Sequence, residues 1–385
     1  MAVISVFYTV LRESVFSFLK KLSVIENWNL RLRETKGEII PLSKIESFLN
    51  DANEVIISKR RKEIRVGLVK DTERHPENYV TRRADWPKYE RFLKNNKIDY
   101  SDYDIHSSKW MDDAVNYDVI IWRPASSPDS QEEALTKIYF LEKYLKKKCY
   151  PSHDELWSYE NKVRCCYLCN HFKLPYVPTF ITNSKRDALD YLNIASFPLI
   201  SKISNGSSSY GIKKIKSRRD AVKYINSCFS DAGRMSYWPF IRQKNYLYFQ
   251  NYIHDSEYDL RIIVISNKLF GYYRYPKSGD FRASGSGIVE KKALPEEAMR
   301  IALRTKELFK STSLAVDMVY SRDEGKYYII ETSIFCGIDT PEQLVIDGKP
   351  GYYVWDGSRF TFHEGRFWVQ DLALDTNDLK YVFAC

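Results

Sequence analysis

Apolar runs and helix-like spacing alternate along the chain from about residue 65. The runs Arg65–Val69 and Asp118–Trp122 predict two buried strands, because short uninterrupted apolar runs are typical of strands covered on both faces. Trp86–Asn96 and Glu132–Lys148 show the spacing of amphipathic helices. Strands that alternate with helices indicate a small open α/β domain, which we place at residues 63–151.

The pattern changes at Ser152. A helix is predicted over Glu155–Phe172, and it ends before the proline-containing segment Leu174–Pro178. Beyond it, β-branched and aromatic runs predict a sheet that we expect to be antiparallel. The predicted strands are Pro198–Ile203, Ile212–Ile215, Tyr246–Ile253, Arg261–Ile265, Leu269–Tyr275, Ala315–Tyr320 and Tyr327–Glu331, and the predicted helices are Asp220–Cys228 and Pro295–Lys310. The whole chain is therefore predicted to be α/β (α+β), with two further parts at residues 152–240 and 241–385.

Residues 1–62 form an N-terminal extension that ends in a basic run. Its first part, residues 2–25, is apolar but is interrupted by Arg12 and Glu13. We expect no signal peptide, because no basic region precedes the apolar part and no small-residue cleavage site follows. Without an apolar stretch of about 18 residues, we also expect no transmembrane helix. Two interpretations stay open for residues 1–25: packing on the body or on a second copy in a homodimer, and peripheral contact with a membrane.

Length, composition and charge limit the functional classes. The 385 residues exceed the roughly 100–200 of one domain, and 44% of them are hydrophobic, which argues for a folded multidomain protein. An excess of 59 Lys and Arg over 50 Asp and Glu gives a net charge of +9, which favours anionic partners such as nucleotides or acidic substrates. The basic residues are dispersed, so no nucleic acid is expected as a partner.

Seven cysteines occur at irregular spacing, and an odd number does not suit a disulfide framework. We therefore expect reduced thiols and a cytoplasmic location. The segment Cys166–Cys169 has a CxxC pattern, but no second ligand pair stands at zinc-site spacing, so buried free thiols are the favoured interpretation.

Lys202 stands at the end of a predicted strand and is followed by the loop Ser204–Gly211, which is rich in serine and glycine. The hydroxyl groups of Ser207 and Ser208 and the backbone N–H groups of such a loop can cover phosphates, while the lysine offsets their charge. The ordinary alternative is a hairpin connection between two strands.

Two arginines stand in segments that can bind an anion. Arg261 lies two positions after Asp259, and Arg282 precedes the Gly/Ser run Ala283–Gly287, which can form a loop around an anion. A guanidinium group can bind a phosphate or a carboxylate through two parallel hydrogen bonds. Each arginine alone is as well explained by a surface ion pair.

Two carboxylates lie on apolar predicted strands that follow each other. Adjacent antiparallel strands would bring Asp317 and Glu331 close together, where two buried carboxylates repel unless a cation lies between them. Oxygen ligands of this kind suit Mg²⁺, which usually keeps waters and nucleotide phosphates in its shell.

In this order the segments resemble the ATP-grasp superfamily, and in particular the branch of the glutamate ligases of ribosomal protein tails and of glutathione synthetase. The resemblance covers roughly residues 152–345 and implies an ATP-grasp fold with a preceding small open α/β domain. It implies that residues 152–240 are the central lid subdomain and that residues 241–385 are the C-terminal subdomain with the metal site. ATP and Mg²⁺ are the implied cofactors.

The resemblance also implies roles for individual residues. Lys162 and Lys202 match the two lysines that contact ATP phosphates, with residues 205–211 as the lid. The remaining implied nucleotide contacts are Gln250, Asn251, Tyr252 and Ile253 at the adenine, Asp259 at the ribose and Ser284 beside Arg282. Asn251 stands where the family usually has glutamate, and Ser284 where asparagine is common. Arg261, Arg274 and Arg282 are implied to contact the transferred phosphate or the substrate.

The implied metal ligands are Asp317, Glu331 and Ser333. The family's usual third ligand is an asparagine, and Ser333 takes its place here. A hydroxyl group, or a water molecule that it holds, can substitute at some cost in Mg²⁺ affinity.

The activity that the resemblance implies is ATP-dependent joining of a carboxylate to an amine through an acyl phosphate. The carboxylate substrate would be a small molecule, a peptide or a sugar acid. Two alternatives remain at this stage. One is a small-molecule kinase of the same fold, and the other is a nucleotide-binding interaction module with weak catalysis.

Overall fold

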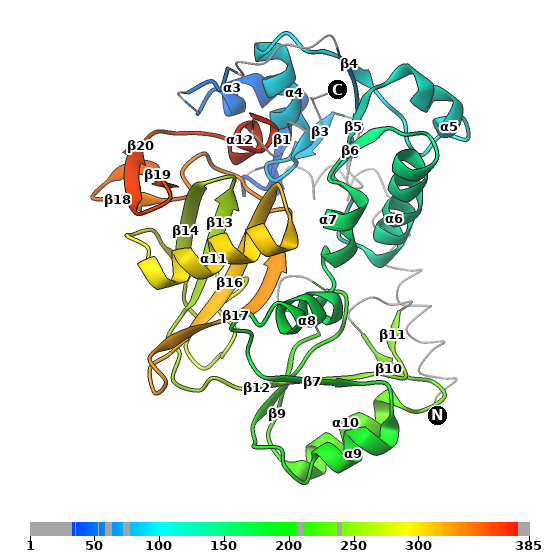
Figure 1. Cartoon of the computed structure of the whole chain (residues 1–385), viewed down its shortest axis with the longest axis vertical. Helices are drawn as coiled ribbons and strands as arrows, with labels where there is room; N and C mark the ends of the chain where they lie inside the picture. The colour runs from blue at the N-terminus through cyan, green and yellow to red at the C-terminus, as the bar shows by residue number, and fades with distance from the viewer. Residues whose placement is uncertain are drawn as a thin grey trace.

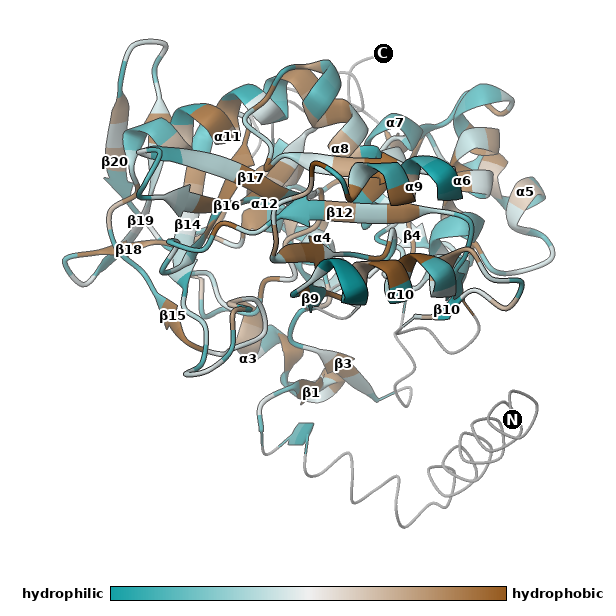
Figure 2. Cartoon of the chain, turned by 90° about the horizontal axis from the view of Figure 1, so that it is seen from below, coloured by the Kyte–Doolittle hydropathy of each residue, from teal (hydrophilic) through white to brown (hydrophobic). Residues whose placement is uncertain are grey.

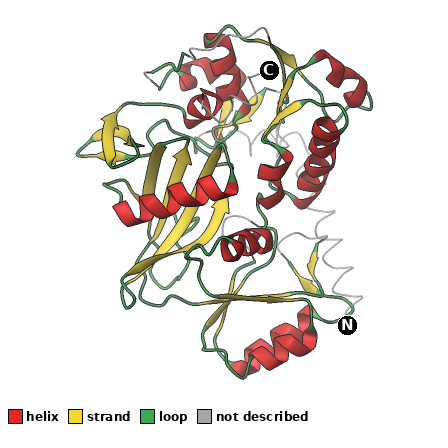
Figure 3. Cartoon of the chain, in the orientation of Figure 1, coloured by secondary structure: helices red, strands yellow, loops and turns green. Residues whose placement is uncertain are grey.

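A computed structural model describes residues 33–34, 36–52, 54–57, 64–71, 78–206, 211–236 and 241–375. The expectations for residues 1–25 and for Ser207 and Ser208 lie outside these residues. Three larger sheets follow one another along the described chain, each with helices on its faces (Figures 1 and 3).

The first larger sheet is parallel, with the strand order β4-β2-β5-β6. Its strands are β2 (Arg65–Leu68), β4 (Asp99–Asp102), β5 (Val119–Ile121) and β6 (Lys148–Tyr150), and its helices are α4 (Trp86–Asn95), α5 (Trp110–Asp113), η2 (Ala114–Asn116) and α6 (Pro128–Lys143). The chain passes from β2 to β4 on one side of β2 and then to β5 on the other side of β2. Such a reversal leaves a crevice at the carboxyl ends of the two strands, where α/β proteins commonly bind ligands.

The predicted strands and the first predicted helix of this part are confirmed, but the predicted helix Glu132–Lys148 is displaced. α6 begins at Pro128, which tolerates the first helical position because its missing N–H would have no partner there. The helix ends by Tyr144, and Lys146 adopts a positive φ of 57°. Lys148 belongs to β6 instead. Two further strands form a small antiparallel pair of their own, β1 (Ile39–Pro41) and β3 (Tyr79–Thr81). β1 precedes β2 together with η1 (Leu42–Lys44) and α3 (Ile45–Leu49), whereas β3 comes between β2 and α4.

The prediction of one helix over Glu155–Phe172 is wrong, because two helices occupy this segment. α7 (His153–Ser158) begins with a capping box between Ser152 and Glu155. α8 (Lys162–His171) begins with Asn161, whose side chain accepts the N–H of Arg164 at 3.1 Å. The second cap starts a new helix and places Lys162 in its first turn.

The second larger sheet is antiparallel, in the order β7-β12-β8-β9. Its strands are β7 (Thr179–Thr182), β8 (Leu199–Ser201), β9 (Lys213–Ile215) and β12 (Leu247–Asn251), and the small pair β10 (Arg234–Met235) and β11 (Arg242–Gln243) lies beside it. The helices α9 (Lys185–Tyr191) and α10 (Arg218–Cys228) lie side by side in Figure 1. The buried residues of α10 are Ala221, Tyr224, Ile225 and Cys228, which is the spacing of a helix with one apolar side (Figure 2).

The third sheet is the largest, and its central path runs β17-β16-β13-β14-β19-β18. Its strands are β13 (Asp259–Ile265), β14 (Lys268–Arg274), β15 (Val289–Glu290), β16 (Ser313–Ser321), β17 (Lys326–Ser333), β18 (Val345–Ile346), β19 (Lys349–Trp355) and β20 (Phe360–Glu364). The helix α11 (Glu296–Phe309) crosses one face, and α12 (Val369–Asp375) packs between β13 and α4 on the other.

β13 shows why this sheet is the centre of the molecule. Its residues Leu260, Ile262 and Val264 belong to the apolar cluster that contains α11. Ile263 and Ile265 belong to a second cluster, which also contains residues of β2, α4 and α12. Successive strand side chains point to opposite faces, so β13 is buried on both sides and joins the parallel sheet to the antiparallel one.

Candidate active site

A cleft of about 230 Å³ lies between the second sheet and the largest sheet. One part of its wall is aliphatic and aromatic, with Val177, Ile200, Ile212, Val319 and Ile330 among its residues. The remainder carries charged groups from β13, β14, β16 and β17, from Lys202 directly after β8 and from the loop that contains Asp280 and Arg282. The predicted site residues that line the cleft are Lys202, Gln250, Asn251, Tyr252, Ile253, Asp259, Arg274, Arg282, Ser284, Asp317 and Glu331.

The end of β12 forms one rim of the cleft. The amide nitrogen of Gln250 donates to Thr179 Oγ1 at 2.9 Å, and the backbone N–H of Asn251 donates to the carbonyl of Pro178 at 2.9 Å. These bonds fix the chain as it leaves the sheet at Tyr252. The ring of Tyr252 lies 3.6 Å from the ammonium group of Lys214 and meets Phe281 edge-on.

Lys214 and Phe281 were missed from the sequence. Lys214 belongs to β9, and Phe281 belongs to the loop before Arg282. The alternation of β9 and the aromatic residue beside Arg282 were available signals, but neither shows that the two side chains meet across the cleft.

Two buried lysines stand at the charged end. Lys162 donates to Glu331 Oε1 at 2.8 Å and to the carbonyl of Gly206. Burial opposes the charged form of Lys162, but the carboxylates of Glu331 and Glu160 outweigh it and raise the pKa of this lysine. Lys202 donates to the carbonyl of Ile330 at 3.2 Å, and burial lowers the pKa of Lys202 to about 8.

Asp317 and Glu331 face each other on β16 and β17, as predicted from the two antiparallel strands. The register passes from Asp317↔Glu331 directly to Met318↔Ile329, so Ile330 is an extra residue in β17. This bulge provides the carbonyl that Lys202 contacts. Bulges of this kind commonly redirect groups beside active sites.

Arg261 and Arg274 hold Asp317 from two neighbouring strands. Arg261 donates to both carboxylate oxygens of Asp317, at 2.7 and 2.8 Å, and Arg274 lies 2.9 Å from Oδ2. Burial alone would raise the pKa of Asp317, but the two guanidinium groups hold this pKa well below its ordinary value. Arg274 also donates to Asp259, where burial raises the pKa of the carboxyl to about 6.

The remaining predicted residues are arranged differently. Arg282 forms an exposed two-pronged ion pair with Asp280 at the mouth of the cleft. Ser333 lies on β17 two residues after Glu331, and its hydroxyl donates to the carbonyl of Phe335 at 2.8 Å. Side chains two apart on a strand share a face, so Ser333 lies on the same side of β17 as Glu331.

A second cleft, of about 170 Å³, lies where the order of the parallel strands reverses. Asp71 and Arg123 come from the carboxyl ends of β2 and β5, Asp85 and Trp86 from the start of α4, and Gly337 from the segment after β17. Arg123 lies 3.2 Å from Asp85 and over the ring of Phe335. The sequence did not reveal this cleft, because its residues are spread over more than half the chain.

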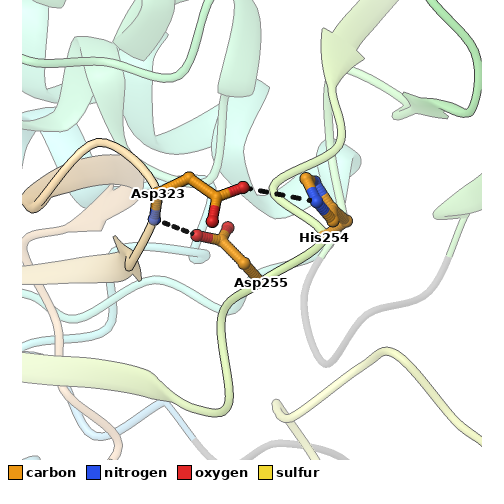
Figure 4. Close-up of side chains that lie close together, drawn as sticks. All are labelled: His254, Asp255 and Asp323. Carbon is orange, nitrogen blue, oxygen red and sulfur yellow. Dashed lines mark hydrogen bonds and ion pairs between the residues drawn. The ribbon is translucent and has the colours of Figure 1, made fainter.

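Among the described residues, three side chains of metal-binding type come close together at one place, the cluster of His254, Asp255 and Asp323 (Figure 4). Asp255 accepts the backbone N–H of Asp323 at 2.6 Å, and His254 pairs with Asp323 at 3.5 Å. The cluster is largely exposed, and these contacts tie two surface loops together. Of the described helices, none combines the length and the apolar character that crossing a membrane requires.

Comparison with known proteins relates part of the chain to a family. Residues 159–346 match the family model of the RimK-like ATP-grasp domain. The chain is similar to the alpha-aminoadipate–LysW ligase LysX of Saccharolobus solfataricus, with 26% identity over 46% of this chain and 62% of the relative. It is also similar to the coenzyme gamma-F420-2:alpha-L-glutamate ligase of Methanocaldococcus jannaschii, with 26% identity over 46% of this chain and 58% of that protein.

The chain thus spans about three fifths of the length of these curated relatives. Among solved structures, D-cycloserine synthetase DcsG aligns with a TM-score of 0.50 and 13% identity, over 70% of this chain and 91% of that one. At this identity the likeness concerns the fold alone. Together with the matched family model it confirms the predicted ATP-grasp fold. The chain therefore carries a RimK-like ATP-grasp domain over residues 159–346.

Proposed function

We propose that this protein is an ATP-dependent ligase that joins a carboxylate to an amine through an acyl phosphate and releases ADP and phosphate. One observation carries the proposal. Lys202, Arg274 and the opposed carboxylates Asp317 and Glu331 line the charged end of a cleft whose other wall is apolar, inside an ATP-grasp domain. Lys162 and Arg261 do not line this cleft but form ion pairs with the two carboxylates. The names of the two curated relatives, both ligases, support it.

In this proposal the nucleotide lies along the cleft between the two antiparallel sheets. The adenine would lie against the aliphatic wall at the rim formed by Gln250–Ile253, with Asp259 at the ribose. The phosphates would extend to Lys202 and Lys162. Both lysines are positively charged hydrogen-bond donors. Their attraction to phosphate oxygens is stronger in a site shielded from water. Ser207 and Ser208 would cover the phosphates from the loop that follows Lys202.

The residues present suit a Mg²⁺ ion. Asp317 and Glu331 face each other, and side-chain cations now offset both charges: Arg261 and Arg274 at Asp317, and Lys162 at Glu331. Ser333 donates one hydrogen bond but keeps oxygen lone pairs that can accept or coordinate. Mg²⁺, when bound, would neutralise charge on the phosphates and polarise the transferred phosphoryl group.

The chain's own residues account for the remaining steps. A carboxylate is a poor acceptor for an amine, since its leaving group would be oxide, and phosphorylation by ATP supplies a better one. Lys162 and Lys202 would hold the phosphoryl group during transfer, and Arg261, Arg274 and Arg282 would orient the substrate carboxylate. Closure of the loop after Lys202 would keep water from the acyl phosphate.

We place the two substrates at the second cleft, which Arg123 lines. Arg123 lies over the ring of Phe335, whose carbonyl accepts the hydroxyl of Ser333. The carboxylate substrate would be a small molecule, a peptide or a sugar acid. We also propose the four-part division stated from the sequence, with residues 1–62 as an extension, 63–151 as the α/β domain, 152–240 as the lid subdomain and 241–385 as the metal-binding subdomain. The parallel sheet, which spans β2 to β6, supports the boundary at residue 151. The strand β12 (Leu247–Asn251) pairs within the second sheet although it lies beyond residue 240, so the last boundary belongs after this strand.

The decisive experiment incubates the purified chain with ATP, Mg²⁺ and hydroxylamine, and adds a panel of amino acids, peptides and sugar acids. We expect a hydroxamate and an equal amount of ADP with at least one acid, because hydroxylamine intercepts an acyl phosphate. A Glu331→Gln variant should give neither product. A stable phosphate ester instead of a hydroxamate would indicate a kinase, and nucleotide binding without ADP release for any acid would indicate a binding module.

A further inference from the structure

Glu160 is a carboxylate beside the active site that the nucleotide contacts described above leave unused. It lies in the short link between α7 and α8, two positions before Lys162. Its Oε2 atom is buried and has no hydrogen-bond partner within the described part of the chain. A buried carboxylate oxygen without a partner is costly, so its presence calls for an explanation.

The backbone at Glu160 is also unfavourable. Its φ of 51° lies in the left-handed region, which residues other than glycine, asparagine and aspartate rarely adopt. The flanking residues hold it there: the N–H of Tyr159 donates to Leu156 at 3.0 Å and that of Asn161 donates to Ser158 at 3.3 Å. A strained residue that is fixed by its neighbours at an active site indicates a functional role.

The charges around Glu160 do not satisfy it. Lys162, Arg123 and Arg261 are its cationic neighbours, and Glu331 is a further anion. Each of these cations has another carboxylate partner: Glu331 for Lys162, Asp85 for Arg123 and Asp317 for Arg261. Burial has the largest effect and raises the pKa of Glu160, which shows that the neighbouring cations compensate the carboxylate only in part.

The position of Glu160 determines from which side a partner can come. Glu331 lines the nucleotide cleft, whereas Arg123 lines the second cleft, and Glu160 has both as neighbours. Glu160 itself lines neither cleft. Because the nucleotide phosphates would occupy the side of Glu331, we place the approach to the free oxygen on the side of Arg123, beside the place where the acyl group would form.

The chemistry of the partner follows from the surroundings. It must be positively charged and carry hydrogen-bond donors. A divalent metal suits the place poorly, since three side-chain cations surround it and the described carboxylates near Glu160 do not converge on a common point. An ammonium group carries a single charge and three donors.

We propose that Glu160 binds the ammonium group of the second substrate, and that the nucleophile is therefore a primary amine that arrives protonated, such as the amino group of an amino acid or peptide. Before the attack the ammonium group passes one proton to the Glu160 carboxylate, so that the freed lone pair forms the amide bond while phosphate leaves the acyl carbon. This assignment rests on the proposed ligase function, because it names the substrate that the acyl phosphate would meet. It does not require Glu160 to contact the nucleotide or the metal.

The first test needs no turnover. Tl⁺ resembles ammonium in size and charge and scatters X-rays anomalously, so crystals with ADP and Mg²⁺ would be soaked in a thallium salt. We expect an anomalous peak in contact with Glu160 Oε2, present also in Glu160→Asp and absent in Glu160→Gln. A wild-type crystal without a peak at this carboxylate overturns the proposal.

The second test compares two nucleophiles of similar size, ammonium and hydroxylamine, of which only the first is charged at neutral pH. Glu160→Gln should lower kcat/KM for ammonium about ten- to a hundredfold and leave that for hydroxylamine near the wild-type value, since a charge-assisted hydrogen bond is lost. Glu132→Gln, on the exposed side of α6, is the matched control. Equal losses for both nucleophiles would mean that Glu160 is structural.

Nucleotide affinity separates this proposal from the proposed function. Calorimetry with a non-hydrolysable ATP analogue should give the same affinity for wild type and Glu160→Gln, whereas weaker Mg²⁺-dependent binding would make Glu160 a metal ligand and overturn its assignment to the amine. If thallium binds at Glu160 but no acid yields a hydroxamate, the ligase function fails while the cation site stands.

Discussion

The ammonium nitrogen of Lys162 lies 2.8 Å from Oε1 of Glu331, although the two residues stand 169 positions apart, on α8 and β17. Lys162 is almost completely buried, whereas Glu331 is 28% exposed. In the proposed complex this pair separates, because the lysine turns to a phosphate and the carboxylate to the metal. The pair thus keeps both groups in place without a nucleotide.

Replacing Lys162 with alanine should weaken binding of a non-hydrolysable ATP analogue about ten- to a hundredfold, since a charge-assisted contact is lost and Glu331 is left uncompensated. Titration calorimetry measures this affinity. Lys185→Ala, on the exposed side of α9, is the matched control and should bind as wild type does. An unchanged affinity of the Lys162 variant would remove this lysine from the nucleotide site.

Lys202 should make nucleotide affinity depend on pH. Burial lowers its pKa to about 8 in the free protein, and phosphate oxygens favour the charged form and so raise this pKa on binding. Between the two pKa values binding takes up a proton, so the affinity should fall as the pH rises above about 8. Calorimetry in buffers of different ionisation enthalpy detects this proton.

A Lys202→Arg variant provides the control for the pH effect, because arginine keeps the charge but does not titrate in this range. It should bind the nucleotide without proton uptake. Identical binding enthalpies of the wild type in all buffers would contradict the assignment of Lys202 to the phosphates.

The metal ligands can be tested by single substitutions at Glu331 and Ser333. Glu331→Gln should nearly abolish turnover, because a neutral amide is a much weaker Mg²⁺ ligand than a carboxylate. Ser333→Asn restores the usual family ligand and should maintain turnover or lower the Mg²⁺ concentration at half-maximal activity. An active Glu331→Gln together with an inactive Ser333→Asn would show that the carboxylates are structural.

Lys88 should contribute to stability and not to nucleotide binding. Its ammonium group donates to the carbonyls of Arg82, Ala84 and Ile338, each at 2.8 Å, and so ties α4 to the segment after β17. Lys88→Met would leave these carbonyls without their donor, and we expect a loss of about 3 kcal/mol in the free energy of unfolding. Urea denaturation measures the loss, and unchanged nucleotide affinity is the control.

The sequence predicted the parts of the site that depend on local pattern. Two apolar strands joined by a turn were sufficient to oppose Asp317 and Glu331. Lys202 was predicted at a strand end and lies directly after β8, whereas its role at the phosphates came from the resemblance and stays a prediction. The second cap at Asn161 was overlooked, so one helix was predicted where there are two. The bulge at Ile330 left no recognisable signal, because an extra residue in a strand changes pairing but hardly changes composition.

Long-range pairing was beyond the reach of the sequence. Arg261 and Arg274 were predicted to face phosphate or substrate, but whether each would meet Asp317 depends on the register of β13, β14 and β16. The second cleft also depends on how the parallel sheet packs against β17. Such contacts form between residues that lie far apart in the chain, and no local pattern specifies them.

The ion pairs at the charged end have a consequence for the influence of salt. Lys162, Arg261 and Arg274 already have carboxylate partners within the chain, and Lys202 has a carbonyl. When a nucleotide binds, its phosphates then replace carboxylate or carbonyl partners of these side chains. Few counterions are released to the solution in this exchange. We therefore expect ionic strength to change the nucleotide affinity much less than for a site lined by exposed, hydrated cations.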